Sequence, residues 1–139
     1  EIEALRKLTD HLYKGSVSAF LVRWNNGTTR DDAIKLGMVR NYATSSEFED
    51  FCEIISHMLV LDPAVFDNDF IAQEDCSTYT NPEDVINCQE LNAGRLLIKQ
   101  KVDLVVEFYK NTFDIDLIEV RDILQTRLDN VIATGTIPN

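Results

Sequence analysis

The sequence has few of the residues that form most recognisable catalytic and metal sites. Its 139 residues include two histidines, five glycines and three cysteines, and no two cysteines have CxxC spacing. So few histidines leave little choice of general base, and so few glycines form no phosphate-binding loop. No apolar run approaches the roughly 18 residues of a membrane span. We therefore expect a protein that is not an enzyme, has no catalytic, cofactor or metal residues, and does not insert into a membrane.

Basic residues are absent from the middle of the chain. No Lys or Arg lies between Arg40 and Arg95, and the net charge of the whole chain is −11 at pH 7. An acidic surface repels nucleic acids and anionic membranes, so neither is expected as a direct partner, whereas it attracts a protein with a basic surface. The acidic residues of this interval are Glu47, Glu49, Asp50, Glu53, Asp62, Asp67, Asp69, Glu74, Asp75, Glu83, Asp84 and Glu90.

The three cysteines, Cys52, Cys76 and Cys88, form no pattern typical of a disulfide framework. A sparse and odd set favours a reducing compartment, so we expect an intracellular protein, cytoplasmic or nuclear. Secretion is the alternative, because Asn26-Gly27-Thr28 is a glycosylation sequon and Cys76 could bridge to Cys88 across a loop. The chain starts in helix-like sequence without an initiator Met, and we interpret residues 1–139 as one helical domain excised from a longer protein.

The longest helical pattern runs from Asn81 to Lys110. Asn81 suits an N-cap, Pro82 suits the first helical position, and the acids after it complement the positive end of the helix dipole. Two adjacent apolar stripes give this segment a wide face that other helices can cover. We expect a central helix over about 82–110, with Asn92-Ala93-Gly94 as the point where it kinks or divides. The first stripe is Leu91, Gly94, Ile98, Val102, Val105 and Tyr109, and the second is Ala93, Leu97, Leu104 and Phe108.

Capping residues and helical spacing predict further helices on both sides of the central one. No stretch alternates as a half-buried strand does. The predicted fold is therefore all-α, a single-domain bundle of five to seven helices packed around the long central helix. Gly15 ends the first helix, Ser16 caps the second, Thr28 or Thr29 caps a third that runs towards Tyr42, Ser46 caps the fourth, Asp62-Pro63 starts a short fifth, and Asp116 and Gly135 bound the last.

Two sets of residues suggest metal sites, and we interpret neither as one. Cys52 and His57, with Cys76 and Cys88, could form a Cys3His zinc site. An offset of five residues turns Cys52 and His57 about 140° apart on a helix, and Cys52 falls on the predicted apolar face with Phe48, Phe51, Ile55, Met58 and Leu59. The carboxylates of residues 67–75 suit calcium but lack the Gly and Glu positions of an EF-hand.

Residues 67–80 show no regular period and are rich in acidic, hydroxyl and amide side chains. A loop of this length inside a compact domain is either functional or mobile. We predict a partner-binding surface here, in which acidic residues speed association and two apolar residues anchor the partner. Trp24, the only tryptophan, is the second candidate, because Trp is enriched at interface hot spots. The predicted partner-binding residues are Asp67, Asp69, Phe70, Ile71, Glu74, Asp75 and Trp24.

These observations favour a non-enzymatic protein–protein interaction module, a regulatory or scaffold domain of a larger protein or complex. It would present a helical groove or the acidic 47–90 region to its partner. The alternative is an acidic inhibitor or decoy, such as a pathogen effector or an antitoxin-like protein, that occupies a basic site on another protein. A hydrophobic groove should tolerate salt, whereas an acidic decoy should lose association rate as salt is added.

Overall fold

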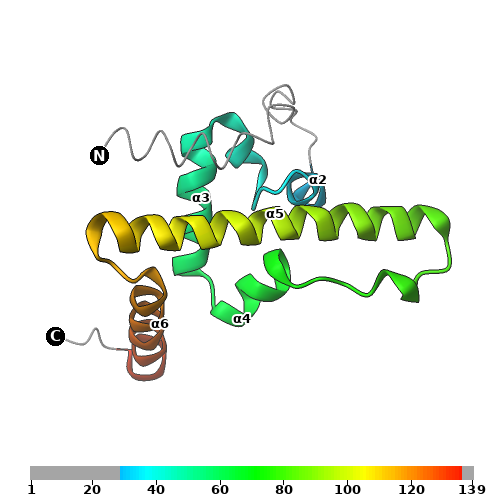
Figure 1. Cartoon of the computed structure of the whole chain (residues 1–139). Helices are drawn as coiled ribbons and strands as arrows, with labels where there is room; N and C mark the ends of the chain where they lie inside the picture. The colour runs from blue at the N-terminus through cyan, green and yellow to red at the C-terminus, as the bar shows by residue number, and fades with distance from the viewer. Residues whose placement is uncertain (1–28, 136–139) are drawn as a thin grey trace.

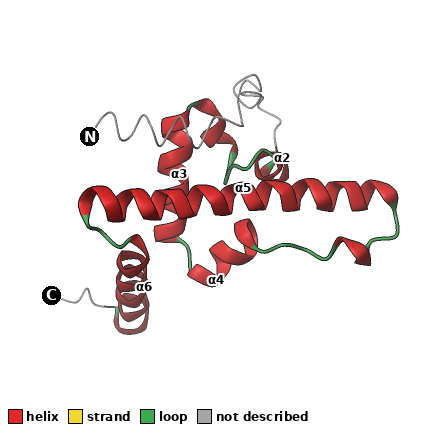
Figure 2. Cartoon of the chain, viewed as in Figure 1, coloured by secondary structure: helices red, strands yellow, loops and turns green. Residues whose placement is uncertain are grey.

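The computed structural model of the protein describes residues 29–135. The first two predicted helices, Trp24 and Asn26 therefore lie outside the described residues. Within residues 29–135 the chain forms five α-helices and three short helical turns, with no strand (Figure 2). The predicted all-α bundle around a long central helix is confirmed.

The central helix, α5 (Pro82–Phe113), is a single helix of 32 residues that spans the molecule (Figure 1). The Asn81 side chain accepts a hydrogen bond from the backbone N–H of Glu83, and the helix ends at Asp114, whose φ of 54° is left-handed. The helix continues without a break through Asn92-Ala93-Gly94. The predicted division of the helix at this point was therefore wrong.

Gly94 marks the place where a second helix, α2 (Arg30–Lys35), touches α5. A Cβ built on Gly94 would lie 1.7 Å from the backbone oxygen of Ile34, so no side chain fits between the two backbones. Gly37 ends α2 with a φ of +75°, and a Cβ built there would lie 2.7 Å from Cβ of Leu97. Both glycines therefore serve the close contact between α2 and α5.

The segments after α2 pack around α5 in chain order (Figure 1). A short 3-10 turn, η2 (Asn41–Ser45), leads into α3 (Glu47–Val60), which packs on α5 towards its C-terminal end. α4 (Pro63–Phe66) continues directly into the π-helical turn η3 (Asp67–Ile71), which also contacts α5. The first part of the predicted irregular loop, residues 67–71, is thus helical.

Two elements lie near the ends of α5. The 3-10 turn η4 (Cys76–Thr78) contacts the N-terminal part of α5, and α6 (Leu117–Thr134) follows its C-terminal end and packs against α3. None of the described helices is both long and apolar enough to cross a membrane. At every predicted helix start in this part of the chain, the capping side chain accepts backbone hydrogen bonds: Thr29, Ser46, Asp62, Asn81 and Asp116.

The hydrophobic core lies where α3, η3 and the segment after α2 meet the first apolar stripe of α5. All six members of that stripe are buried or half-buried, as predicted. The second stripe was only partly correct, because Ala93 is exposed and Leu97 is 43% exposed. The buried members of the core are Ile34, Val39, Phe51, Ile54, Met58, Phe66, Phe70, Leu91, Ile98, Val105 and Leu117.

The buried face of α3 differs from the predicted one. Phe48 and Cys52 are exposed, whereas Asp50 and Ile54 are fully buried. The predicted face included Cys52 because its spacing from Phe51 and Ile55 is helical. Spacing alone did not show that a carboxylate on the neighbouring face is buried.

A buried ion pair accounts for this difference between the predicted and the observed buried face of α3. Lys101 of α5 is 4% exposed and Asp50 of α3 is 0% exposed, and Lys101 Nζ lies 2.6 Å from Asp50 Oδ2. The same ammonium group donates a hydrogen bond to the backbone oxygen of Gly37 at 2.7 Å. One lysine thus joins α5, α3 and the turn after α2.

Replacing Lys101 by Met should lower the free energy of unfolding by about 3–5 kcal/mol, because the buried Asp50 carboxylate loses this cation. Lys99→Met is the matched control, since Lys99 pairs with Asp103 where both side chains are exposed and should cost less than about 1 kcal/mol. Denaturant unfolding of both variants measures the difference. Equal losses would contradict the importance of the buried pair.

Ile98→Ala should cost about 2–5 kcal/mol, because Ile98 is fully buried in the core. Leu97→Ala, at the neighbouring residue, should cost about 1 kcal/mol or less, because nearly half of that side chain already lies in water. Thermal and denaturant unfolding compare the two. A larger loss at Leu97 than at Ile98 would mean that α5 presents a different face to the core.

Candidate functional site

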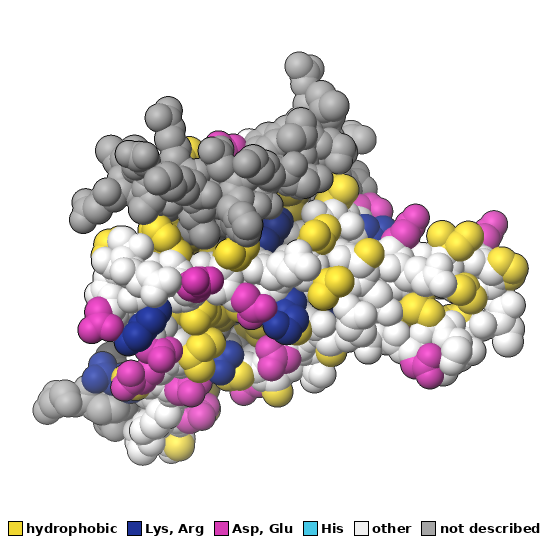
Figure 3. Space-filling view, viewed as in Figure 1, with side chains coloured by type: hydrophobic (Ala, Val, Ile, Leu, Met, Phe, Trp, Pro, Cys, Tyr) yellow, Lys and Arg dark blue, Asp and Glu magenta, His cyan; other side chains and the backbone are white. Residues whose placement is uncertain are grey.

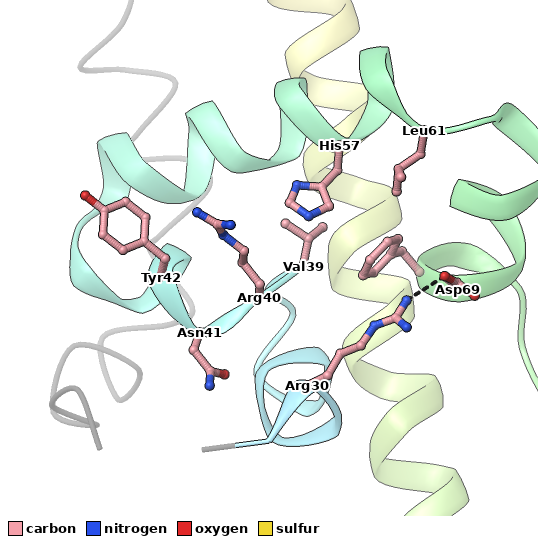
Figure 4. Close-up of a pocket in the computed structure, with 9 residues that line it drawn as sticks. Arg30, Val39, Arg40, Asn41, Tyr42, His57, Leu61 and Asp69 are labelled. Atoms are coloured by element: carbon pink, nitrogen blue, oxygen red, sulfur yellow. Dashed lines mark hydrogen bonds and ion pairs between the residues drawn. The ribbon is translucent and has the colours of Figure 1, made fainter. Parts of the chain in front are cut away.

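A cavity of about 700 Å³ opens between the segment after α2, α3 and η3 (Figure 4). This volume lies within the range of about 300–1,000 Å³ that small-molecule sites occupy. Apolar side chains form part of the wall and charged side chains stand beside them. The described lining residues are Arg30, Val39, Arg40, Asn41, Tyr42, His57, Leu61, Asp69 and Phe70.

Local sequence signals place these side chains. Thr29 and Asp32 form a capping box, which fixes the start of α2 and thus Arg30. The turn at Gly37 then directs Val39, which is buried, and the residues after it towards α3. The Asp62 cap starts the helical segment that carries Asp69 and Phe70 to the other side of the cavity.

Arg30 closes one side of the cavity. Its Nη2 lies 2.6 Å from Asp69 Oδ2, and its guanidinium carbon lies 4.8 Å from the ring centre of Phe70. The ion pair and the ring together fix the plane of the guanidinium group. Phe70 itself is 3% exposed and belongs to the core.

Arg40, Glu53, His57 and Tyr42 form the other side. Arg40 Nη2 lies 2.6 Å from Glu53 Oε1, and the Arg40 guanidinium lies 5.5 Å from the ring centre of Tyr42. His57 Nδ1 lies 2.8 Å from the backbone oxygen of Glu53 and 3.4 Å from Glu53 Oε2. A carbonyl oxygen only accepts, so Nδ1 donates and Nε2 of the neutral ring is an acceptor.

Cations from outside the acidic interval pair with some of its carboxylates. Within residues 29–135, ion pairs join five of its twelve carboxylates to basic residues that precede Asn41 or follow Gly94, so the region is not a uniform negative surface. The face drawn in Figure 3 likewise shows Lys and Arg among the acids. The pairs are Asp50–Lys101, Glu53–Arg40, Asp69–Arg30, Glu74–Arg95 and Glu90–Lys35.

Residues 72–81, which we call the arm, lie beside the N-terminal part of α5. A disulfide joins Cys76 to Cys88, so these two cysteines are bonded to each other and are not free to act as zinc ligands. The Asn92 side chain accepts a hydrogen bond from the backbone N–H of Glu74 and donates one to its backbone oxygen. The second half of the predicted loop is therefore fastened to the central helix.

Glu74 joins the arm to α5 through its carboxylate. Its Oε1 lies 2.8 Å from Arg95 Nη1, and its Oε2 accepts a hydrogen bond from the Tyr79 hydroxyl at 3.1 Å. The Arg95 guanidinium first, and the Tyr79 hydroxyl second, hold the pKa of Glu74 below its usual value of 4.5. The same hydrogen bond raises the pKa of Tyr79 above 10.0.

The structure separates the residues that the sequence grouped as one binding surface. Only Asp69 and Phe70 line the cavity, and Phe70 is too deeply buried to act as an exposed anchor. Ile71 packs against the core, Asp67 and Asp75 are exposed, and Trp24 lies outside the described residues. Their role in partner binding stays a prediction.

Sequence reasoning missed the lining residues Arg30, Arg40 and Tyr42, because they lie outside the acidic loop. Two features of the sequence could have indicated this site. Glu53 and His57 share a helix face at i,i+4 spacing, and Arg40 is the last basic residue before the acidic interval.

A comparison with known protein families shows to which family this chain belongs. A sequence model of the family Peptidase_Mx1, described as "Putative zinc-binding metallo-peptidase", matches residues 3–118. The chain belongs to this family. No curated protein and no solved structure shows a significant match.

Membership of this metallo-peptidase family overturns the functional interpretation of the sequence. The non-enzymatic interaction module, the regulatory or scaffold domain and the alternative of an acidic inhibitor or decoy were wrong, because the family is described by a peptidase activity. The prediction that the chain is not an enzyme fails for the same reason. It relied on the lack of a short catalytic motif, whereas the match extends over most of the chain.

The described residues do not fit a zinc site. Residues 29–135 contain no group of three or more His, Cys, Asp or Glu side chains placed to hold a metal ion, whereas zinc needs three or four protein ligands. His57 is the only histidine among them, the neighbouring Glu53 carboxylate binds Arg40, and two of the cysteines form a disulfide. A zinc ion bound by this family member needs ligands from outside residues 29–135.

The lowered pKa of Glu74 predicts a pH-dependent contribution to stability. A carboxylate with a depressed pKa in the folded state stabilises the fold above its unfolded pKa, near 4.5, and loses this contribution as the pH falls through the folded value. Glu74→Gln should therefore lower Tm at pH 7, and the difference from the unmodified protein should shrink below pH 4.5. Thermal unfolding at several pH values measures it.

Glu107→Gln is the control, because the structure records no ion pair between Glu107 and any described residue. Its difference from the unmodified protein should change less with pH. A Glu74→Gln difference that stays constant from pH 7 to pH 3 would contradict the role of the Arg95 ion pair.

Proposed function

We propose that the chain acts in peptide hydrolysis and that the cavity between α3 and η3 holds a segment of the peptide substrate. The observation that carries the proposal is the match of residues 3–118 to a metallo-peptidase family. All nine described lining residues lie between Arg30 and Phe70, a part of the chain that also contributes much of the core. The substrate would thus bind to a rigid part of the molecule.

The lining suits a peptide. Leu61, which is half-buried, offers an apolar contact for a side chain, and Tyr42, which is 41% exposed, offers a ring edge at the rim. His57 Nε2 is an acceptor for the N–H of a peptide bond, because Nδ1 is already bound to the Glu53 backbone. In this proposal the described residues bind and orient the peptide, and the metal is held elsewhere in the protein.

We also propose that the protein matures in an oxidising compartment. The support is the Cys76–Cys88 disulfide, since such bonds persist in secreted, periplasmic or cell-surface proteins and are rare in reducing interiors. This proposal replaces the intracellular location expected from the sparse cysteines.

Fluorescence polarisation with a library of labelled hexapeptides tests the substrate site on the complete chain. Tyr42→Ala and His57→Gln should each weaken peptide binding about tenfold, because they remove a rim contact and an acceptor inside the cavity. Tyr79→Ala is the matched control, since this tyrosine is equally exposed, at 41%, but lies on the arm. The proposal fails if no peptide binds, or if the cavity variants bind as well as the control.

Mass spectrometry of the same peptides after incubation with the chain and one equivalent of Zn²⁺ tests hydrolysis. We expect cleavage that 1,10-phenanthroline stops. Peptides that bind in the cavity and are never cleaved would restrict the proposal to substrate binding.

A further inference from the structure

We propose that the cavity selects peptides that carry a carboxylate, which the guanidinium groups of Arg30 and Arg40 bind. The inference rests on the proposed function, because it names the substrate class of the same cavity. Figure 4 shows Arg40 beside Tyr42 and Arg30 beside Asp69, on opposite sides of Val39 and His57. The two arginines thus stand on either side of the space that a peptide would occupy.

The first argument is the contrast between the cavity and the rest of the chain. The chain has a net charge of −11, and residues 41–94 contain no Lys or Arg. The described lining nevertheless includes two arginines, and each is matched by one carboxylate, Asp69 or Glu53, so the formal charge of this set is 2 − 2 = 0. A negatively charged group therefore meets less repulsion at the cavity than over the rest of this acidic protein.

The second argument is that both guanidinium groups are held in place before a ligand arrives. Each is anchored through Nη2 by a carboxylate at 2.6 Å, Asp69 for Arg30 and Glu53 for Arg40. Each also lies over an aromatic ring. A side chain that is already ordered loses less conformational entropy on binding, which favours affinity.

The third argument is the donor capacity that remains. A guanidinium group has five N–H donors in a planar fork that matches the two oxygens of a carboxylate. Among the described residues, the structure records no side-chain hydrogen bond from Nε or Nη1 of Arg30 or Arg40. Both side chains are about half exposed, at 52% and 54%, so these donors can reach a ligand.

A peptide offers a carboxylate from two sources, its C-terminus or an Asp or Glu side chain. Four fluorescein-labelled hexapeptides distinguish them: one with a central Glu and one with a central Gln, each with a free and with an amidated C-terminus. Dissociation constants are measured by fluorescence polarisation with the complete chain at low and high salt. We expect at least one carboxylate-bearing peptide to bind tenfold or more tightly than the amidated Gln peptide, and the preference to weaken in high salt.

The pattern of the four constants identifies the source. Tighter binding of both free-acid peptides assigns the C-terminal carboxylate, and tighter binding of both Glu peptides assigns the side chain. Equal binding of all four overturns the inference and leaves the proposed function standing. If none of the four binds and the peptide library also gives no binder, both proposals fall together.

Variants test whether the two arginines carry the preference. In Arg40→Gln and Arg30→Gln the ratio of the dissociation constants of the neutral and the charged peptide should fall from tenfold or more towards one. Arg127→Gln is the control, because Arg127 is exposed on α6 and does not line this cavity. It should leave the ratio unchanged.

Arg30→Lys and Arg40→Lys keep the test valid if either Gln variant does not fold. They retain the cation beside Asp69 or Glu53 but lose the planar fork, so the ratio should still fall at least threefold. A ratio that is unchanged in every folded variant at both positions overturns the inference.

Discussion

The contact between Lys101 and its two partners constrains how the three parts of the fold can be arranged. An ammonium group in a dry core is tolerated only where oxygen atoms replace its water, and here Asp50 Oδ2 and the Gly37 oxygen do so. α3 and the turn after α2 must both reach α5 at the same point. The segment from Gly37 to Tyr42, which forms one wall of the cavity, is therefore positioned by a charge buried beneath it.

Local signals in the sequence were sufficient to predict the helices, and non-local ones were needed to predict their buried faces. Asn81, Asp116 and Gly135 marked helix ends because capping depends only on neighbouring residues. Periodicity placed Ile98 and Val105 in the core correctly. It could not show that Lys101, one turn from each, is buried as well, because its partner Asp50 lies 51 residues away in the sequence.

The cavity could not be predicted from spacing for the same reason. Arg30 and Asp69 lie 39 residues apart, and only the folded chain brings them to 2.6 Å. Phe70 was predicted to be an exposed anchor, whereas its ring lies in the core at 3% exposure, because the helical turn around it was not foreseen. The peptidase relationship was also beyond a search for motifs, since it rests on a pattern spread over residues 3–118 and not on a short run of catalytic residues.

The Cys76–Cys88 bond lies between two parts of the central helix that are held in place by different contacts. From Leu91 onwards α5 is held by the core, whereas residues 82–87 have no buried side chain. Cooperative opening of the first part therefore need not disturb the second. One continuous helix is thus held by the core over most of its length and by a covalent bond near its N-terminal end.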